Sequence, residues 1–171
     1  LFTFTFGPKW LTIAWRAAFR EMSASDDDQR EQWQKRRLKA YNGSLRHFLQ
    51  SLVKGRAEKE GFSIYTSSNP RLGDRRVRLS ANEDEILSPG TSSNEKQLRF
   101  QDYLEVEFES GPATVWRTPR GVPSSSSSEI SWLQLAREFV TINSMGEYVE
   151  PYSLNVTGEW ARQRVSDALP I

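Results

Sequence analysis

Hydrophobic and polar residues alternate at the start of the chain, on both sides of a Gly7-Pro8 step. Phe2, Phe4 and Phe6 alternate with threonines, and every second residue from Leu11 to Phe19 is apolar. A period of two is typical of a strand with one buried face, and Gly-Pro steps mark turns. We therefore expect two antiparallel strands here.

The apolar spacing becomes helical after Ser25, which is followed by three aspartates, Asp26 to Asp28. A serine cap and acidic residues in the first turn stabilise the N-terminus of a helix. The next apolar residues lie three or four positions apart: Leu38, Tyr41, Leu45, Phe48 and Leu52. Because this stripe keeps its phase across Asn42-Gly43-Ser44, the pattern favours one long or kinked helix to about Glu60. Glycine often ends helices, so two helices broken at Gly43 are the alternative.

Alternation returns after Gly61 and predicts further strands. They are FSIYTSS (62–68), RRVRLS (75–80), ATVWRT (113–118), SWLQLA (131–136) and EFVTIN (138–143). Another strand is predicted from Leu98 to Phe108, where the apolar residues share one parity, Asp102 is the polar exception, and glutamates occupy the opposite face at 105, 107 and 109. The five serines at 124–128 predict a solvated loop. Thr157-Gly158 introduces a short helix, EWARQRVSDAL, that stops at Pro170.

These elements predict an α+β fold. We expect one antiparallel sheet of about six to eight strands, packed by the long helix and closed by the short C-terminal helix. A chain of 171 residues suits a single domain spanning 1–171. Since the chain starts at Leu1 within a predicted strand, we expect it to be a fragment of a longer protein.

Composition excludes several kinds of site. Lysine and arginine number 23 against 22 aspartates and glutamates, so the net charge does not attract nucleic acid or an anionic membrane. The absence of cysteine excludes disulfides, thiolate catalysis and zinc-thiolate sites. No apolar run approaches the roughly 20 residues that span a bilayer, so we expect no membrane insertion. The first residues do not resemble a signal peptide.

Two motifs resemble a known family. The first runs from Trp33 through Arg37, Ala40-Tyr41, Gly43-Ser44 and His47-Phe48-Leu49 to Glu60-Gly61-Phe62. The second is the C-terminal segment VTINSMGEYVEPYSLNVTGEWARQRVSDALPI, with Gly158, Trp160, Arg164 and Pro170 as its marked positions. In this order the motifs resemble the carboxypeptidase-regulatory-like domain-containing proteins of the Bacteroidetes type, in the region after their transthyretin-like β-sandwich.

The resemblance implies a location in the bacterial envelope, in the periplasm or at the outer membrane. It implies no catalytic activity, because "carboxypeptidase" refers to a regulatory β-domain in this family. The motif residues would therefore be structural. The β-sandwich and the signal peptide of the family would lie before Leu1.

Few residues offer chemistry of their own. His47 could act as a general base, but no partner nucleophile or second metal ligand is recognisable, and a hydrogen-bonded core histidine is favoured. Asp26 to Asp28 and Glu83 to Glu85 lack the spacing of a calcium loop, so helix capping and a solvated loop are favoured. Ser44 lacks the flanking glycines of a nucleophile elbow. The sequence predicts no metal site and no cofactor.

Basic and aromatic residues leave two kinds of partner open. The clusters Lys35–Lys39 and Arg71–Arg78 could hold phosphates, although glutamates interleave the helical cluster. Trp116 and Trp132 could face a ligand such as a glycan, since neither follows a stripe that predicts core. We expect a non-enzymatic structural or ligand-presenting module with an envelope protein or a glycan as its partner. Glycan binding is the first alternative, and nucleic-acid binding the second.

Overall fold

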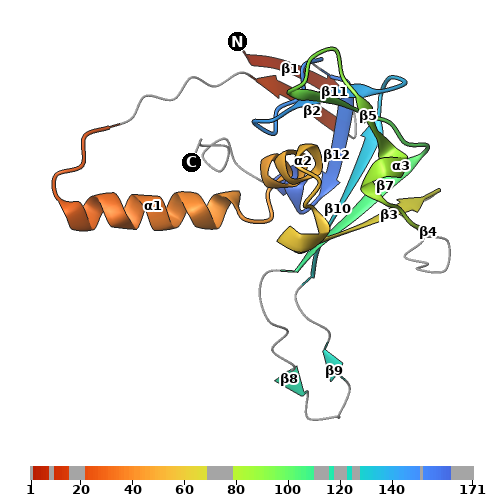
Figure 1. The fold of residues 1–171 in the computed structure, drawn as a ribbon. Helices are drawn as coiled ribbons and strands as arrows, with labels where there is room; N and C mark the ends of the chain where they lie inside the picture. Colours follow the sequence, from red (N-terminus) through yellow and green to blue (C-terminus); the bar gives the residue numbers. More distant parts are fainter. Residues whose placement is uncertain are drawn as a thin grey trace. The chain divides into compact units, whose positions relative to one another are not determined.

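The computed structural model describes residues 2–7, 10–15, 22–68, 79–109, 116–117, 123–124, 128–150 and 152–162. The chain divides into two compact units. Figure 1 labels the helices and strands that each unit contains. One contains the residues up to Tyr41, and the other spans Asn42–Gln163.

The first unit contains an antiparallel hairpin and one helix. Strand β1 (Phe2–Gly7) pairs with β2 (Trp10–Trp15), which confirms the two predicted strands up to Trp15. Ala17 and Phe19, predicted to extend the second strand, lie outside the described residues. Helix α1 (Asp27–Tyr41) begins one residue after Asp26, whose Oδ1 accepts the Gln29 backbone N–H at 2.7 Å. The cap is therefore Asp26 rather than the predicted Ser25.

The single long helix is not confirmed, because α1 and α2 (Leu45–Val53) are separate helices. Gly43 lies between them with φ of 76°, in the left-handed region that ends a helix. Ser44 then caps α2 by accepting the backbone N–H of His47 at 3.1 Å. The structure thus has two helices broken at Gly43.

The two helices differ in burial although one apolar stripe runs through both. Helix α1 contains no buried residue, and Leu38 is 51% exposed. Helix α2 completely buries Phe48 and Leu49. The predicted stripe therefore supplies core only in its second half.

The second unit confirms the α+β class but has two main sheets instead of one. A five-stranded antiparallel sheet has the order β12-β10-β7-β3-β4, and a three-stranded sheet has the order β11-β6-β5. The first consists of β3 (Phe62–Ser67), β4 (Leu79–Ser80), β7 (Tyr103–Glu109), β10 (Ser128–Leu135) and β12 (Leu154–Gly158). The second consists of β5 (Leu87–Pro89), β6 (Glu95–Leu98) and β11 (Val140–Asn143). Two short strands, β8 (Trp116–Arg117) and β9 (Pro123–Ser124), pair with each other.

The division into two sheets corrects the strand predicted from Leu98 to Phe108. Leu98 ends β6, the chain turns through residues 99–102, and β7 begins at Tyr103. Asp102 has φ of 55°, which interrupts the extended backbone. The apolar residues from Leu98 to Phe108 therefore share one parity although they belong to two different sheets. Within β7 the prediction is confirmed, since Leu104, Val106 and Phe108 are buried.

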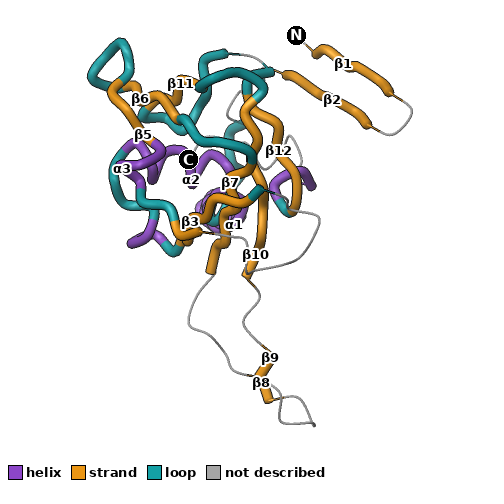
Figure 2. Tube along the Cα trace, turned by 90° about the vertical axis from the view of Figure 1, so that its right-hand side faces the viewer, coloured by secondary structure: helices purple, strands orange, loops and turns teal. Residues whose placement is uncertain are grey.

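One hydrophobic core joins α2 to both sheets. It includes Phe48 and Leu49 from α2, Leu98 and Ile142 from the three-stranded sheet, and Leu104 and Leu133 from the five-stranded sheet. Figures 1 and 2 both show α2 lying against the strands of this unit.

Three short helices complete the described structure. Helix η1 (Glu58–Glu60) precedes β3, and α3 (Glu83–Ile86) is capped by a reciprocal Asn82–Glu85 capping box. Helix η4 (Trp160–Arg162) begins where the C-terminal helix is predicted, and residues 163–171 lie outside the described residues. No helix in the part of the chain that the structure describes is both long and apolar enough to cross a membrane.

Candidate functional site

The two family-like motifs meet in the core of the second unit. The indole N–H of Trp160 donates to the carbonyl oxygen of Gly43 at 2.6 Å, although 117 positions separate the two residues. The Trp160 ring lies 5.2 Å from that of Phe48, measured between centroids. Five of the marked residues therefore form one cluster, which we call the motif cluster: Gly43, Ser44, His47, Phe48 and Trp160.

Gly43 is required at its position for two reasons. Its positive φ is unfavourable for a residue with a side chain. A Cβ atom there would also collide with the ring of Phe108. The missing side chain thus lets the turn between the helices lie directly on β7.

His47 is a buried, neutral imidazole, with only 8% of its surface exposed. Its Nδ1 accepts the backbone N–H of Gly43 at 3.1 Å, so in this hydrogen-bond network the ring proton is on Nε2. Nε2 lies 3.0 Å from Oε2 of Glu60 and donates to it. Burial lowers the pKa of His47 below its ordinary value, and the Glu60 carboxylate opposes this shift without reversing it.

Glu60 is the acceptor on which several groups converge. The Ser51 hydroxyl contacts Glu60 Oε2 and also lies 2.7 Å from the carbonyl oxygen of His47. Arg56 Nη2 lies 3.1 Å from Glu60 Oε1. Burial raises the pKa of Glu60, but Ser51, Arg56 and His47 together outweigh burial, so the pKa lies below its ordinary value.

These contacts hold His47 in place. A general base needs a ring nitrogen directed at a substrate proton, whereas both nitrogens of His47 already bond to protein atoms. A serine nucleophile would bond to the imidazole, whereas Ser51 bonds to Glu60 and is completely buried. These hydrogen bonds therefore order the turn at Gly43, the end of η1 and the start of β3.

The second motif is held by backbone geometry. Gly158 has φ of 82°, and a Cβ atom there would lie 2.5 Å from the carbonyl oxygen of Ile130. Two residues later, the backbone N–H of Trp160 donates to the Ser131 hydroxyl at 3.0 Å. Gly158 thus allows the chain to leave β12 close to β10 and to direct Trp160 into the core. Arg164 and Pro170 lie outside the described residues.

The remaining predicted residues belong to other elements of the chain. Trp33, Arg37 and Tyr41 are half-buried residues of α1 in the first unit. Trp132 is a half-buried residue of β10, where its indole N–H donates to Glu105 Oε2 at 3.0 Å on the neighbouring strand. Trp116 belongs to β8, and its side chain is not among those described.

Some residues of the acidic and basic clusters have partners within the chain. Glu83 Oε1 accepts the backbone N–H of Ala57 at 2.7 Å, and Glu85 takes part in the capping box of α3. Lys35 lies 2.6 Å from Glu31 one helical turn away. Residues 71–78 lie outside the described ranges. Among the described residues, no group of three or more potential ligand side chains is arranged to hold a metal ion.

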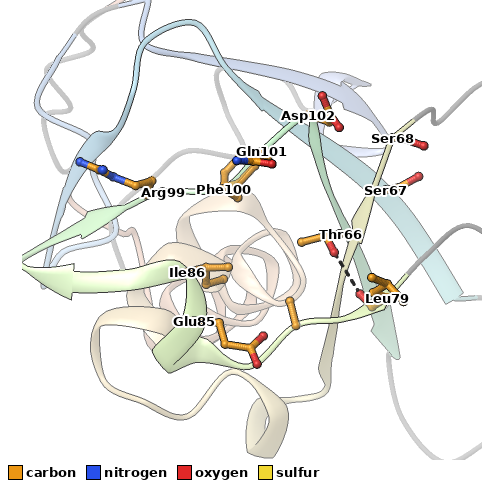
Figure 3. Close-up of a pocket in the computed structure, with 11 residues that line it drawn as sticks. Thr66, Ser67, Ser68, Leu79, Glu85, Ile86, Arg99, Phe100, Gln101 and Asp102 are labelled. Atoms are coloured by element: carbon orange, nitrogen blue, oxygen red, sulfur yellow. Dashed lines mark hydrogen bonds between the residues drawn. The ribbon is translucent and has the colours of Figure 1, made fainter.

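Sequence reasoning missed two features. Ser51 lies four residues after His47 on α2, and helical spacing alone could have placed both side chains on one face. The other feature is a pocket of about 510 Å³ between the end of β3, β4, α3 and the 99–102 segment (Figure 3). Its residues come from four separated stretches, so no local pattern indicates it.

The contacts within this chain distinguish the motif cluster from the pocket. The motif cluster is closed and hydrogen-bonded, whereas the pocket opens to the surface. Comparison of the chain with protein-family models, with curated proteins and with solved structures finds no match.

Proposed function

We propose that this chain is a non-enzymatic module of a secreted bacterial envelope protein, which presents its surface to a partner protein or a glycan. The proposal combines the resemblance of the two motifs to the carboxypeptidase-regulatory-like family with the geometry of the motif cluster. The residues of the motif cluster, which carry part of the resemblance, lie in the core and contact one another. Their chemistry therefore supports the scaffold and leaves recognition to the surface.

One observation carries the non-enzymatic part of the proposal. The chain contains a single histidine, and both of its ring nitrogens are engaged, one with the Gly43 N–H and the other with Glu60. Moving a proton through this ring would break a contact of a buried turn. Such a histidine contributes to stability, so its replacement should lower the free energy of unfolding.

The experiment compares stability with turnover. The protein and its His47→Gln variant are tested against ester, peptide and glycoside substrates, and both are unfolded with urea. We expect no turnover by either protein and a lower free energy of unfolding for the variant. Turnover by the parent that disappears in a folded His47→Gln variant would overturn the proposal.

The envelope part of the proposal is tested separately. The full open reading frame, carrying a C-terminal tag, is expressed in its own bacterium, and the cells are fractionated. We expect the tagged protein in the envelope fractions, after a periplasmic marker protein and an outer-membrane marker protein have validated the separation. Recovery with a cytoplasmic marker would refute the location.

A further inference from the structure

The pocket between β3, β4, α3 and residues 99–102 has the size of a small-ligand site. Its volume is about 510 Å³, within the roughly 300–1,000 Å³ typical of such sites. It is independent of the motif cluster, because none of the motif residues lines it. Figure 3 shows that its lining residues come from separate strands and turns.

The deeper wall of the pocket is apolar. Ile86 and Ala81 belong to the core and are 3% and 8% exposed. Phe100 is half-buried and packs against the same core. On the opposite side Leu79 is 72% exposed, so a large apolar side chain borders the pocket. An apolar wall with one aromatic ring suits the C–H faces of a ligand.

The remaining lining is rich in neutral hydrogen-bonding groups and carboxylates. The hydroxyl and amide side chains of Thr66, Ser67, Ser68 and Gln101 can both donate and accept. Glu85 and Asp102 carry carboxylates, which only accept. Glu85 already accepts the Asn82 backbone N–H at 3.1 Å, but a carboxylate offers about four acceptor positions. A matching ligand must therefore supply several donors.

Charge argues against an anionic ligand. Among the described residues that line the pocket, Arg99 is the one cation, and its Nη1 lies 2.9 Å from Oε1 of Glu138. In Figure 3 its side chain extends away from the space bordered by Thr66 and Glu85. Among the described lining residues, the carboxylates of Glu85 and Asp102 therefore set the charge facing a ligand, and they repel phosphate and carboxylate groups.

We infer that this pocket binds a neutral saccharide, with sugar hydroxyls donating to Asp102 and Glu85 and a sugar face packing on the Phe100 side. The inference rests on the proposed function, because it names a glycan as the ligand that the module presents or captures. It assigns recognition to the pocket and not to Trp116 or Trp132. Hydroxyl groups donate and accept, which matches the mixed lining, and they bring no charge.

The test is an amide-resolved NMR titration of the whole chain labelled with nitrogen-15. The neutral probes are cellobiose, xylobiose, maltose and N-acetylglucosamine. Glucuronate is the anionic probe, and lysine amide acetylated at Nα, with a free side-chain ammonium, is the cationic probe. We expect at least one neutral sugar to shift the amides of Thr66, Ile86 and Gln101. Glucuronate should leave these amides unchanged, and the cationic probe, which the carboxylates attract but which lacks sugar hydroxyls, should bind more weakly than the sugar.

A pair of variants locates the site. Asp102→Asn removes the carboxylate charge but keeps a residue that tolerates positive φ. We expect its affinity for the bound sugar to fall about tenfold, the value of one charged hydrogen bond. Asp84→Asn is the matched control, because Asp84 is exposed and does not line the pocket. Its affinity should equal that of the parent.

Several outcomes would overturn the inference: no binding by any neutral sugar, binding of the charged probes alone, shifts centred on Trp132, or equal losses in both variants. None of them decides the proposed function, which the turnover and fractionation experiments test. Retained folding of each variant is read from the dispersion of the same spectra. If the Asp102→Asn variant has a lower affinity for the sugar and keeps native dispersion, the loss reflects a missing contact with the ligand and not unfolding.

Discussion

Trp160 and Gly43 are joined by a hydrogen bond of 2.6 Å between the indole N–H and a main-chain carbonyl oxygen. The same glycine gives its N–H to His47, so both of its backbone polar groups are bonded inside the core. A buried turn whose peptide groups are satisfied in this way tolerates little substitution. The predictions below test this arrangement and the packing around it.

Trp160→Phe should lower the free energy of unfolding by about 1–3 kcal/mol, because the Gly43 carbonyl would stay buried without its donor. Urea unfolding measures the effect. Trp132→Phe is the control: its indole N–H bonds to Glu105 at a half-buried position, where water can replace it. The control should lose less than about 1 kcal/mol. Equal losses in the two variants would argue against a special role for the Gly43 contact.

Gly43→Ala should cost about 2–5 kcal/mol, combining left-handed strain with the collision against Phe108. Gly55→Ala provides the comparison, since Gly55 also has positive φ, at 64°, but its nearest neighbour is a Glu83 side-chain oxygen at 3.5 Å. It should cost only the strain, about 1–2 kcal/mol. The difference between their unfolding free energies isolates the contact with Phe108, and a difference near zero would contradict it.

Phe48→Ala should cost about 3–5 kcal/mol, because Phe48 is completely buried between Phe62 and Trp160. Leu79→Ala, at a side chain that is 72% exposed, should change stability by less than about 0.5 kcal/mol. Thermal and urea unfolding of both variants give the comparison. A parental melting curve for Phe48→Ala would refute the packing of α2.

Stability should fall as the pH is lowered through the range below 6.5, the ordinary pKa of histidine. The pKa of His47 in the folded protein lies below that value. As the pH falls, the histidine of the unfolded chain therefore binds a proton before the histidine of the folded protein, and the free energy of unfolding decreases. The pKa of folded Glu60 is also lowered, so a further loss follows below 4.5, the ordinary value for glutamate. Both groups thus contribute stability that is present at neutral pH and disappears in acid.

His47→Gln tests which group causes the first part of this fall. The variant should be less stable at neutral pH, but its stability should change less between pH 6.5 and 4.5 than that of the parent. Urea unfolding at a series of pH values provides the measurement. A parental slope in the variant would assign the fall to other groups.

Local patterns predicted many of the elements. The alternation of phenylalanines with threonines predicted β1, and the parity of Leu104, Val106 and Phe108 predicted the buried face of β7. The stripe through Leu45, Phe48 and Leu52 predicted that the residues of α2 are helical, although as part of one longer helix. Such patterns succeed because a strand or helix with one buried face repeats at a period set by its own backbone.

The sequence by itself therefore determined the α+β class, the positions of most described strands and the burial of α2. Tertiary structure decided that the helix breaks at Gly43, that the segment from Leu98 to Phe108 serves two sheets, and that His47 bonds to Glu60 and Gly43. It also brought Trp160 to Gly43 and formed the pocket beside Phe100. These features depend on contacts between segments that are far apart in the sequence. Such contacts produce no periodic pattern of hydrophobic and polar residues, so the sequence alone does not reveal them.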